Sequence, residues 1–414
     1  MIKLGTVFSG IGGIEQALIR LGIPHDIVFA CDNGDVEINL LENEELAEYI
    51  KLKKLRSKKQ LKSKDDISRL AELSAKENRK AEEIREQVYN CSEKIEKKKL
   101  IDTLYAQKSR QINFVKKTYL ANYDLSHDDY HLDIRFLDGR DYAGIDLLVG
   151  GSPCQSFSTV GAQRGLEDTR GTLFYDYVRI IQQTRPKVFI YENVRGLTTH
   201  DDGQTLSIIL NSFRNGLGYD VPDPCILNAS DYGIPQTRRR IFVVGFRKDI
   251  PHKPFSYPEP VALKYTMQDF LEDNCAAGHF NYDPETGGLV VEKVSGKADD
   301  KFTLTPAVQR YVLSAGTGSY RTSTQTDLPV ARTLMKMMTQ HHRAGVDNYI
   351  TVSHDPLTLR QLSDREALRL MGYPDSFKIA VSSTQTLRQA GNSMVVDVMM
   401  AIMKSIIKTG VFDE

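Results

Sequence analysis

Long apolar runs are missing from this 414-residue chain. No stretch approaches the roughly 20 apolar residues of a membrane-spanning helix, so we expect no membrane contact. The apolar start, residues 1–8, is too short for a signal peptide and predicts a strand. Cysteine is scarce too: the five cysteines are odd in number, and no two lie at metal-ligand spacing. We therefore expect neither a disulfide framework nor a cysteine zinc site. The same scarcity of cysteine predicts a reducing, cytoplasmic environment.

Net charge is absent as well, because 54 Lys+Arg balance 54 Asp+Glu. A neutral total neither requires nor excludes nucleic acid as a partner, since a basic groove can be offset elsewhere on the surface. The charge is unevenly distributed along the chain. Residues 42–117 contain 21 Lys+Arg and 14 Asp+Glu, which gives +7, so the rest of the chain carries −7.

Glycine and proline are both absent from residues 35–138, which predicts long helices. Apolar residues recur there mostly in steps of three and four, with interruptions at Ser74 and Glu77: Ile67, Leu70, Ala81, Ile84, Val88, Cys91 and Ile95. We predict an antiparallel helical hairpin with a coiled-coil seam, inserted over 42–117. Three roles stay open for it: a solvated spacer, a lysine-rich arm that contacts DNA phosphates or a partner, and a homodimer contact.

The first residues predict a nucleotide-binding strand–helix–strand unit. A strand over 3–8, a glycine loop over 9–13 and a helix over 14–21 are followed by a strand over 27–31. The loop glycines do not follow the dinucleotide spacing, so an ordinary tight turn is the alternative interpretation. Asp32 ends the second strand, where an acidic side chain can bond ribose hydroxyls.

A second feature is a stiff turn after the apolar stretch 145–149. Gly150 and Gly151 allow a sharp bend there, and Pro153 fixes the backbone just before Cys154. The stretch reads as a buried parallel strand, and open α/β sheets hold reactive groups beyond the carboxyl ends of such strands. From this segment alone, a reactive thiol and a small core residue are equally good interpretations.

Five motifs now occur in order along the chain: Phe8-Ser9-Gly10-Ile11-Gly12-Gly13, Gly151-Ser152-Pro153-Cys154-Gln155, Glu192-Asn193-Val194, Gln236-Thr237-Arg238-Arg239-Arg240 and Gln389-Ala390-Gly391-Asn392-Ser393. The set resembles the DNA (cytosine-5)-methyltransferases. Further matching segments lie at 165–174 and 362–367. The resemblance covers roughly residues 1–40, 118–249 and 357–410, and leaves 42–117 unexplained.

The resemblance implies that the Cys154 thiolate adds to cytosine C6, which gives C5 the enamine character it needs for methylation. Glu192 would supply a proton to ring N3, and its neutral form would require a pKa raised by burial. Asn193 would orient the neighbouring loop. Arg238 and Arg240, two residues apart, would point to one side and grip the extruded base and its phosphates. Gln236 would anchor this DNA-contacting loop.

The methyl donor implied by the resemblance is S-adenosylmethionine. Phe8 would stack near its adenine, and Asp32 would hold the ribose; Asp32 stands where a longer Glu is frequent in the family. The other implied donor contacts are Gly10, Gly12, Asn33, Asp133, Ile134, Pro153, Leu173, Asn392 and Ser393. The assignment of Asp133 depends on matching the family pattern across about 100 intervening residues, because the insert begins soon after Asp32.

The implied DNA contacts fall on two segments. A cytosine inside a duplex must be extruded before its C6 can be attacked. Loop 155–172 would close over the base, with Ser156, Gln163, Arg164 and Arg170 at the DNA. Major-groove reading would fall to the region 250–356, with Arg321 and Arg343 among its contacts. We expect no metal site, since His341 and His342 have no third ligand nearby in the sequence.

The implied fold class is α/β, with a Rossmann-like, mainly parallel methyltransferase sheet. We expect a catalytic domain formed by 1–41, 118–249 and 357–414, the helical hairpin over 42–117, and a smaller target-recognition domain over 250–356. The predicted function is sequence-specific C5 methylation of cytosine in double-stranded DNA, in a restriction-modification or phage self-protection setting. The alternatives are a tRNA cytosine C5 methyltransferase and a catalytically inactive DNA-binding scaffold.

Overall fold

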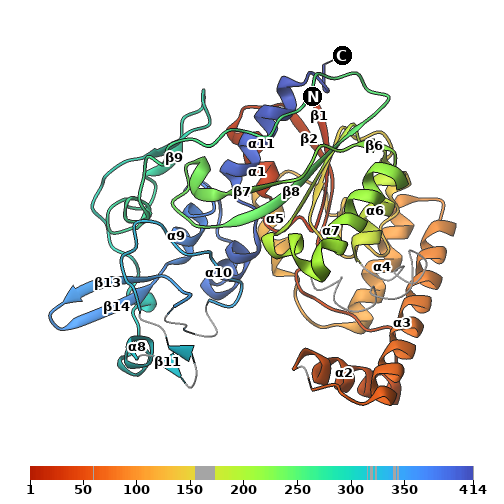
Figure 1. The fold of residues 1–414 in the computed structure, drawn as a ribbon, viewed down its shortest axis with the longest axis horizontal. Coiled ribbons are helices and arrows are strands. Elements are labelled where there is room, and N and C mark those ends of the chain that lie inside the picture. Colours follow the sequence, from red (N-terminus) through yellow and green to blue (C-terminus); the bar gives the residue numbers. More distant parts are fainter. Residues whose placement is uncertain are drawn as a thin grey trace.

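The structure is a computed structural model that describes residues 1–58, 60–153, 173–314, 316–317, 320–321, 324–338, 342 and 345–413. Its main unit is an eight-stranded sheet in the order β3-β2-β1-β4-β5-β8-β6, with β7 also paired to β8 (Figure 1). Five strands form its parallel part: β1 (Ile2–Val7), β2 (His25–Cys31), β3 (Tyr130–His131), β4 (Leu147–Gly150) and β5 (Val188–Val194). The others pair antiparallel: β6 (Tyr219–Asp220), β7 (Cys225–Asn228) and β8 (Arg239–Arg247). The predicted α/β fold with a mostly parallel sheet is confirmed.

Both faces of the sheet are covered, which explains why the central strands are apolar throughout. In β5, Val188 and Ile190 belong to one buried core, while Phe189 and Tyr191 belong to the other. This alternation follows from the two-residue period of a strand. The first core includes α1 (Gly13–Arg20) and α11 (Val396–Lys408), and the second includes α6 (Leu173–Thr184) and α7 (Gln204–Asn211).

The C-terminal segment returns to complete the sheet domain. Arg20 of α1 forms an ion pair with Asp397 of α11, with 2.8 Å between the guanidinium and carboxylate atoms. Before α11 lies α10 (Ser383–Asn392), and the two helices are separated by a short break at Ser393. By length and composition alone the stretch Ser383–Lys408 could cross a membrane, but 61% of its apolar window is buried inside the protein. Core helices of globular domains have this same character.

The predicted insert is helical, but it is not a simple two-helix hairpin. It contains α2 (Asn43–Ser57), α3 (Lys64–Asn90) and α4 (Lys94–Lys108), and α5 (Phe114–Asn122) leads back to the sheet. The predicted seam is also incomplete, because Ile67 and Ile95 are 50% and 64% exposed. Instead, α3 uses Leu70 and Leu73 against α2, and Ala81 and Val88 against α4 and the segment before α2. Two small cores replace one continuous seam.

Among the described residues of 250–356 there are two short 3-10 helices, and the other elements are short hairpins and one α-helix, on the left of Figure 1. They are β9 (Phe280–Tyr282) with β10 (Leu289–Val291), α8 (Pro306–Leu313), β11 (Gly316–Thr317) with β12 (Tyr320–Arg321), and β13 (Tyr349–His354) with β14 (Leu357–Gln361). The division after residue 356 falls in the turn between β13 and β14, two strands that pair with each other. After β14 ends at Gln361, α9 (Asp364–Arg369) begins, and the Ser363 side chain caps it.

Candidate active site

The turn after β4 packs against the end of β5. A Cβ added to Gly151 would lie 2.3 Å from the Glu192 carbonyl oxygen and 3.2 Å from Oε2 of the Glu192 side chain. Only glycine therefore fits at residue 151, and the turn lies directly beside the Glu192 carboxylate. The next residues along this turn lead toward Cys154, which is outside the described residues.

Glu192 is paired with Arg240 across the antiparallel strands β5 and β8. Oε1 of Glu192 lies 3.1 Å from Nε of Arg240, and the two side chains are 15% and 18% exposed. The strand register places Arg240 opposite Val194, so the ion pair is a diagonal contact on one face of the sheet. Because Arg240 engages Oε1, the other carboxylate oxygen faces the Gly151 turn.

Asn193 connects this turn to β5. Its buried amide nitrogen Nδ2 donates 2.9 Å hydrogen bonds to the Ser152 carbonyl and to the Tyr191 hydroxyl. Its Oδ1 accepts from the main-chain nitrogen of Val194. The Ser152 and Tyr191 hydroxyls are themselves 2.9 Å apart. This closed network fixes the start of the turn.

Contrary to the sequence-based expectation, Arg238 is not exposed beside Arg240 to grip a base. It is 3% exposed, and its guanidinium donates to the carbonyls of Leu334, Gly391 and Ser393 at 2.7–3.1 Å. Residue 238 precedes β8, so the two-residue alternation of a strand does not apply to it. Burial and the nearby Arg240 charge lower the pKa of Arg238 to about 9, which still leaves it a cation at neutral pH. Arg238 thus connects the segment around Leu334 and the C-terminal end of α10 to the sheet domain.

Gln236 has a similar structural position, which corrects its expected DNA contact. Its side chain is fully buried. The Nε2 amide donates to the Leu370 carbonyl at 2.7 Å, and Oε1 accepts from the Leu334 main-chain nitrogen at 3.1 Å. A side chain with no solvent exposure and satisfied polar atoms cannot also reach a duplex in this conformation. It does anchor its loop, as the sequence predicts.

The glycine loop after β1 has the shape of a ligand cradle. Phe8, Gly10 and Gly12 have positive φ values of 53°, 54° and 82°. A Cβ on Gly12 would lie 2.2 Å from the Tyr123 ring, whereas one on Gly10 would meet nothing within 4 Å. The loop is therefore tight against the protein at Gly12 and open at Gly10, where a ligand can approach the backbone.

Asp32 closes one side of this cradle. Its carboxylate accepts from the main-chain nitrogens of Gly10 at 2.9 Å and Gly34 at 2.7 Å. A carboxylate has about four lone-pair sites, so roughly two are left for hydroxyl donors. Burial raises the pKa of Asp32. The open backbone at Gly10 and this remaining acceptor capacity fit the ribose of an adenosine-containing donor. Asn33, next along, uses its Oδ1 to accept from the Asp35 nitrogen.

Asp133 is fully engaged, which corrects its expected contact with adenine. Its carboxylate accepts from the Arg135 guanidinium at 2.7–3.1 Å and from the Tyr105 hydroxyl at 2.8 Å. The Arg135 main-chain nitrogen adds a further hydrogen bond of 3.0 Å. Ile134 is buried in the second core, and its carbonyl accepts from Arg179. Asp133 therefore shapes this loop, and its side chain has no acceptor site left for a ligand.

The remaining predicted donor contacts lie at two places. Pro153 is exposed and Leu173 half-buried, at the two borders of residues 154–172, which the structure does not describe. Asn392 is exposed at the end of α10. Ser393 is buried, with its hydroxyl 2.7 Å from that of Tyr373, so it supports the chain instead of facing a ligand.

Several predicted residues lie outside the described part of the chain: Cys154, Ser156, Gln163, Arg164, Arg170 and Arg343. Arg321 is described only in its backbone, within β12. Among the residues that are described, no group of His, Cys, Asp or Glu side chains could hold a metal ion.

Two residues near the donor cradle escape sequence reasoning: Tyr105 and Asn113. Tyr105 reaches Asp133, and Nδ2 of Asn113 donates to the Asp32 carbonyl at 2.8 Å. Both lie in the insert, 28 and 81 residues from their partners, so no local pattern reveals the contacts. The one available signal is that Asn113 caps α5, a position that asparagine favours.

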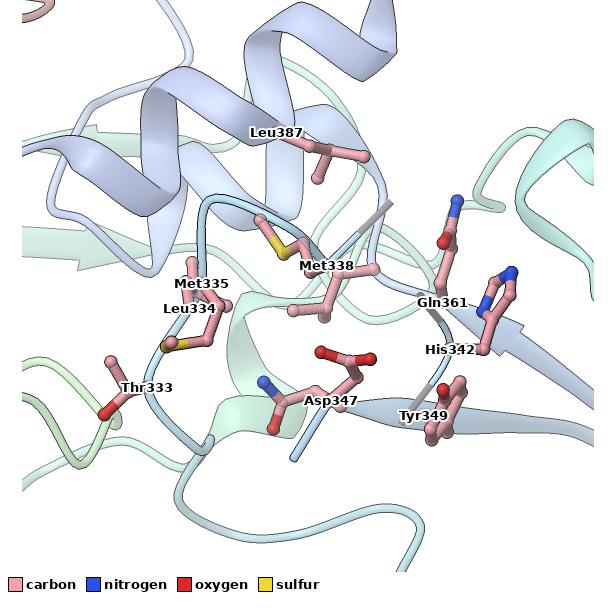
Figure 2. A pocket seen from close by; sticks show the side chains of 11 residues that line it. Thr333, Leu334, Met335, Met338, His342, Asp347, Tyr349, Gln361 and Leu387 are labelled. Atoms are coloured by element: carbon pink, nitrogen blue, oxygen red, sulfur yellow. The ribbon is translucent and has the colours of Figure 1, made fainter. Parts of the chain in front are cut away.

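A small cavity lies away from these residues, where the region 250–356 meets α10. Its volume is about 20 Å³, close to that of one water molecule. Figure 2 shows Leu387 on one side of it, with Met338, His342 and Tyr349 around the rest. None of the predicted catalytic or donor-binding residues lines it. It is a packing gap and not the reaction site.

The family model of C-5 cytosine-specific DNA methylases matches residues 105–408. The chain belongs to this family, whose members are S-adenosylmethionine-dependent enzymes that methylate cytosine at C5. Type II methyltransferase M.HpaII of Haemophilus parainfluenzae is 36% identical over 306 residues, covering 71% of this chain and 80% of that enzyme. M.HhaI of Haemophilus parahaemolyticus is 32% identical over 302 residues, covering 72% and 83%.

Solved structures show the same fold. The S. pombe Dnmt2 methyltransferase superposes with a TM-score of 0.59 at 17% identity, covering 98% of each chain. A putative DNA modification methyltransferase of an E. coli prophage gives a TM-score of 0.55 at 19% identity, covering all of both chains. At these identities the likeness concerns the fold alone.

Proposed function

We propose that this enzyme methylates C5 of a cytosine within a specific sequence of double-stranded DNA, as the modification partner of a restriction system or for phage self-protection. The relatives it resembles are Type II methyltransferases, which supports this setting. We place the reaction in the cytoplasm, at the carboxyl edge of the sheet. The observation that carries the proposal is the Glu192–Arg240 pair, whose second carboxylate oxygen faces the Gly151 turn leading to Cys154.

The chemistry follows from these positions. The Cys154 thiolate forms a bond to C6 of an extruded cytosine while N3 gains a proton, and electron density moves to C5. Glu192 is the proton donor at N3, and Arg240 holds its carboxyl group in place. S-adenosylmethionine, when bound, would supply the methyl group to C5 and leave as S-adenosylhomocysteine. Loss of the C5 proton and return of the N3 proton to Glu192 would then expel the thiolate and restore the aromatic ring.

The donor is held, in this proposal, by the cradle formed from the Phe8–Gly12 loop and Asp32. Its ribose hydroxyls would bond the acceptor sites that Gly10 and Gly34 leave free on the Asp32 carboxylate. Ile134 would form an apolar wall beside the adenine. The side chains of Asp133 and Ser393 support this pocket without contacting the donor.

The target sequence would be read by the region 250–356, which together with the sheet domain of 1–41, 118–249 and 357–414 completes the proposed organisation. Short hairpins joined by irregular loops suit this task, because loops on a fixed scaffold can vary their side chains without changing the fold. Base contacts in the major groove then set the sequence specificity.

Sequencing of 5-methylcytosine in DNA from cells that express the protein tests this function. We expect methylation at one fixed sequence with the wild type, none with Cys154→Ala, and normal methylation with Cys225→Ala as the matched control. Methylation that persists in Cys154→Ala would overturn the mechanism. Methyl incorporation into tRNA but not into duplex DNA would show that the substrate is wrong.

A further inference from the structure

We propose that the helical insert positions the methyl-donor pocket, through Tyr105 and Asn113. The inference rests on the proposed location of the donor beside Asp32 and Ile134. Neither residue would touch the donor; each acts through the loop that it holds. The insert would then be a working part of the enzyme and not a solvated spacer.

Tyr105 holds the loop after β3. Its ring is buried between α4 and the sheet domain, at 6% exposure, and its hydroxyl donates to Oδ2 of Asp133 at 2.8 Å. Burial, reinforced by the Asp133 charge, raises the pKa of Tyr105, so it remains a hydrogen-bond donor at neutral pH. Arg135 clamps the same carboxylate from the other side. Ile134 lies in the chain between Asp133 and Arg135, which these contacts hold in place.

Asn113 holds the loop after β2. Nδ2 donates to the Asp32 carbonyl at 2.8 Å, while Oδ1 caps α5 by accepting from the Lys116 nitrogen at 2.8 Å. A Cβ on Gly34 would lie 2.1 Å from that Oδ1, so the two segments are in close contact. Because the Asp32 carboxylate in turn bonds Gly10, the contact connects the insert to the glycine loop.

The insert is fixed strongly enough to act as such a support. The buried Glu77 carboxylate of α3 accepts from the main-chain nitrogens of Leu40 and Leu41 at 3.0 Å. Lys97 of α4 forms ion pairs with Asp138 and Asp141 at 2.8 and 2.7 Å. An apolar core joins these helices to the segments that follow β2 and β3. These are the two segments that carry the proposed donor contacts.

Calorimetric titration of the protein with S-adenosylmethionine alone, without DNA, tests this proposal. Tyr105→Phe removes the hydroxyl, and Asn113→Asp removes the amide donor but keeps a residue able to cap α5. We expect each change to weaken donor binding about 5- to 10-fold, as expected for one hydrogen bond, and to raise the donor KM. The kcat at saturating donor and the KM for DNA should stay unchanged.

The matched control is Tyr219→Phe, which removes a buried hydroxyl hydrogen bond of 2.8 Å to the Pro186 carbonyl at the other edge of the sheet. It should lower stability to a similar extent and leave donor affinity intact. Asp32→Ala tests the location of the donor site itself, whereas Tyr105→Phe and Asn113→Asp test its positioning by the insert. If Asp32→Ala weakens donor binding while Tyr105→Phe and Asn113→Asp do not, the positioning proposal is wrong. If Asp32→Ala also has no effect, the donor site itself is misplaced.

A different observation, the distribution of charge within the insert, carries a second inference. Residues 49–64 contain eight Lys+Arg and no Asp or Glu. Three of the four acidic residues just before them form ion pairs with the other insert helices: Glu42 with Lys108, Glu45 with Lys76 and Glu48 with Arg69. Lys51, Lys53, Lys58 and Lys62 of this stretch are exposed, and they form a positive surface on α2 and the loop after it, which we call the α2 basic surface.

The α2 basic surface is part of a folded element. Leu52 of α2 is buried against Leu70 and Leu73 of α3, which fixes the orientation of the helix. In Figure 1, α2 projects in the lower part of the molecule, as do α8 and β11 of the region 250–356. We infer that the α2 basic surface binds phosphates of duplex DNA flanking the target, on the opposite side of the reaction site from the reading region. This inference rests on the proposed DNA substrate.

Duplex DNA binding measured over a range of salt concentrations tests the second inference. The variant replaces four exposed lysines with glutamine: Lys51, Lys53, Lys58 and Lys62. We expect weaker binding to target and non-target duplexes alike, and a salt dependence reduced by about 0.9 for each phosphate that the variant no longer neutralises. The kcat at saturating DNA and the donor affinity should not change, which separates this outcome from a failure of the proposed function.

The control carries the same change of charge at the opposite, amino edge of the sheet, at the exposed residues Lys3, Lys248, Lys253 and Lys408. It should bind DNA with the wild-type salt dependence. Equal salt slopes for the wild type and the α2 variant would overturn the inference. Equal losses in both variants would overturn it too, since they would reflect net charge alone.

Discussion

Arg240 and Arg238 lie two residues apart but belong to regions of opposite character. The catalytic edge, formed by Gly151–Pro153, Glu192 and Arg240, keeps a partly exposed ion pair at 3.1 Å. The seam, formed by Gln236, Arg238 and the carbonyls around Leu334 and Gly391, buries its polar groups and satisfies them within the chain. One short motif thus contains a residue of the proposed reaction site, Arg240, and a buried structural residue, Arg238. Solvent access, more than residue type, separates the two roles.

Removing the carboxylate at the catalytic edge should have the largest effect. Glu192→Gln keeps the shape of the side chain but cannot supply the proton proposed for N3. We expect kcat to fall by about 10²- to 10⁴-fold, the usual contribution of a general acid, with an unchanged melting temperature. Steady-state methyl transfer on duplex DNA measures it. Glu292→Gln, which alters an exposed carboxylate paired with His279, should keep full activity.

Exchanging each arginine for methionine tests whether Arg238 contributes to stability and Arg240 to activity. Arg238→Met leaves the carbonyls of Leu334, Gly391 and Ser393 without their donor, so we expect unfolding to become easier by about 4 kcal/mol. Arg240→Met should change the unfolding free energy little and reduce kcat instead. Denaturant unfolding and kinetics on both variants decide the matter. If both variants lose only activity and neither loses stability, the structural role assigned to Arg238 is wrong.

The donor side offers a pH test. Glu15 lies in α1 behind the glycine loop, fully buried, and accepts from the Tyr119 hydroxyl at 2.6 Å. Burial raises the pKa of Glu15 from 4.5 to about 7. The folded state therefore holds the proton more tightly than the unfolded state. Its contribution is complete below pH 4.5 and is lost as the pH rises through 7, a change of about 3 kcal/mol.

Unfolding free energies of the wild type and Glu15→Gln, compared at several pH values, measure this contribution. The wild type should lose stability relative to the variant between pH 4.5 and 7, and the difference should then level off. A constant difference across this range would show that Glu15 does not carry the proton.

The sheet and the catalytic edge follow from the sequence for a physical reason. Apolar strands with motif residues at their carboxyl ends place those residues on one edge in any open parallel sheet. The pattern alone therefore predicts that Glu192 and Asn193 lie near the end of a strand, and the structure places both in the last part of β5. The seam is different: Arg238 finds its carbonyl partners 96 to 155 residues away, and no local pattern specifies such contacts.

In the insert, too, the sequence predicts the local structure but not the long-range contacts. Its helical content follows from the lack of glycine and proline, but that composition does not predict its division into three helices. Ser63, whose hydroxyl accepts from the Asp66 nitrogen, begins α3, and the Ser-x-x-Asp pattern there resembles a capping sequence. Tyr105 and Asp133 meet only because α4 docks on the sheet domain. Tertiary packing therefore determines which insert residues contact the sheet domain.

Trapping the covalent intermediate tests the central claim, that Cys154 attacks cytosine next to Glu192. A duplex with 5-fluorocytosine at the target position has no C5 proton to lose, so the thiolate cannot be expelled after methylation. With S-adenosylmethionine present, we predict a stable protein–DNA adduct whose peptide map places the modified base on Cys154. An adduct on another residue, or none from a protein that methylates the normal duplex, would contradict the account.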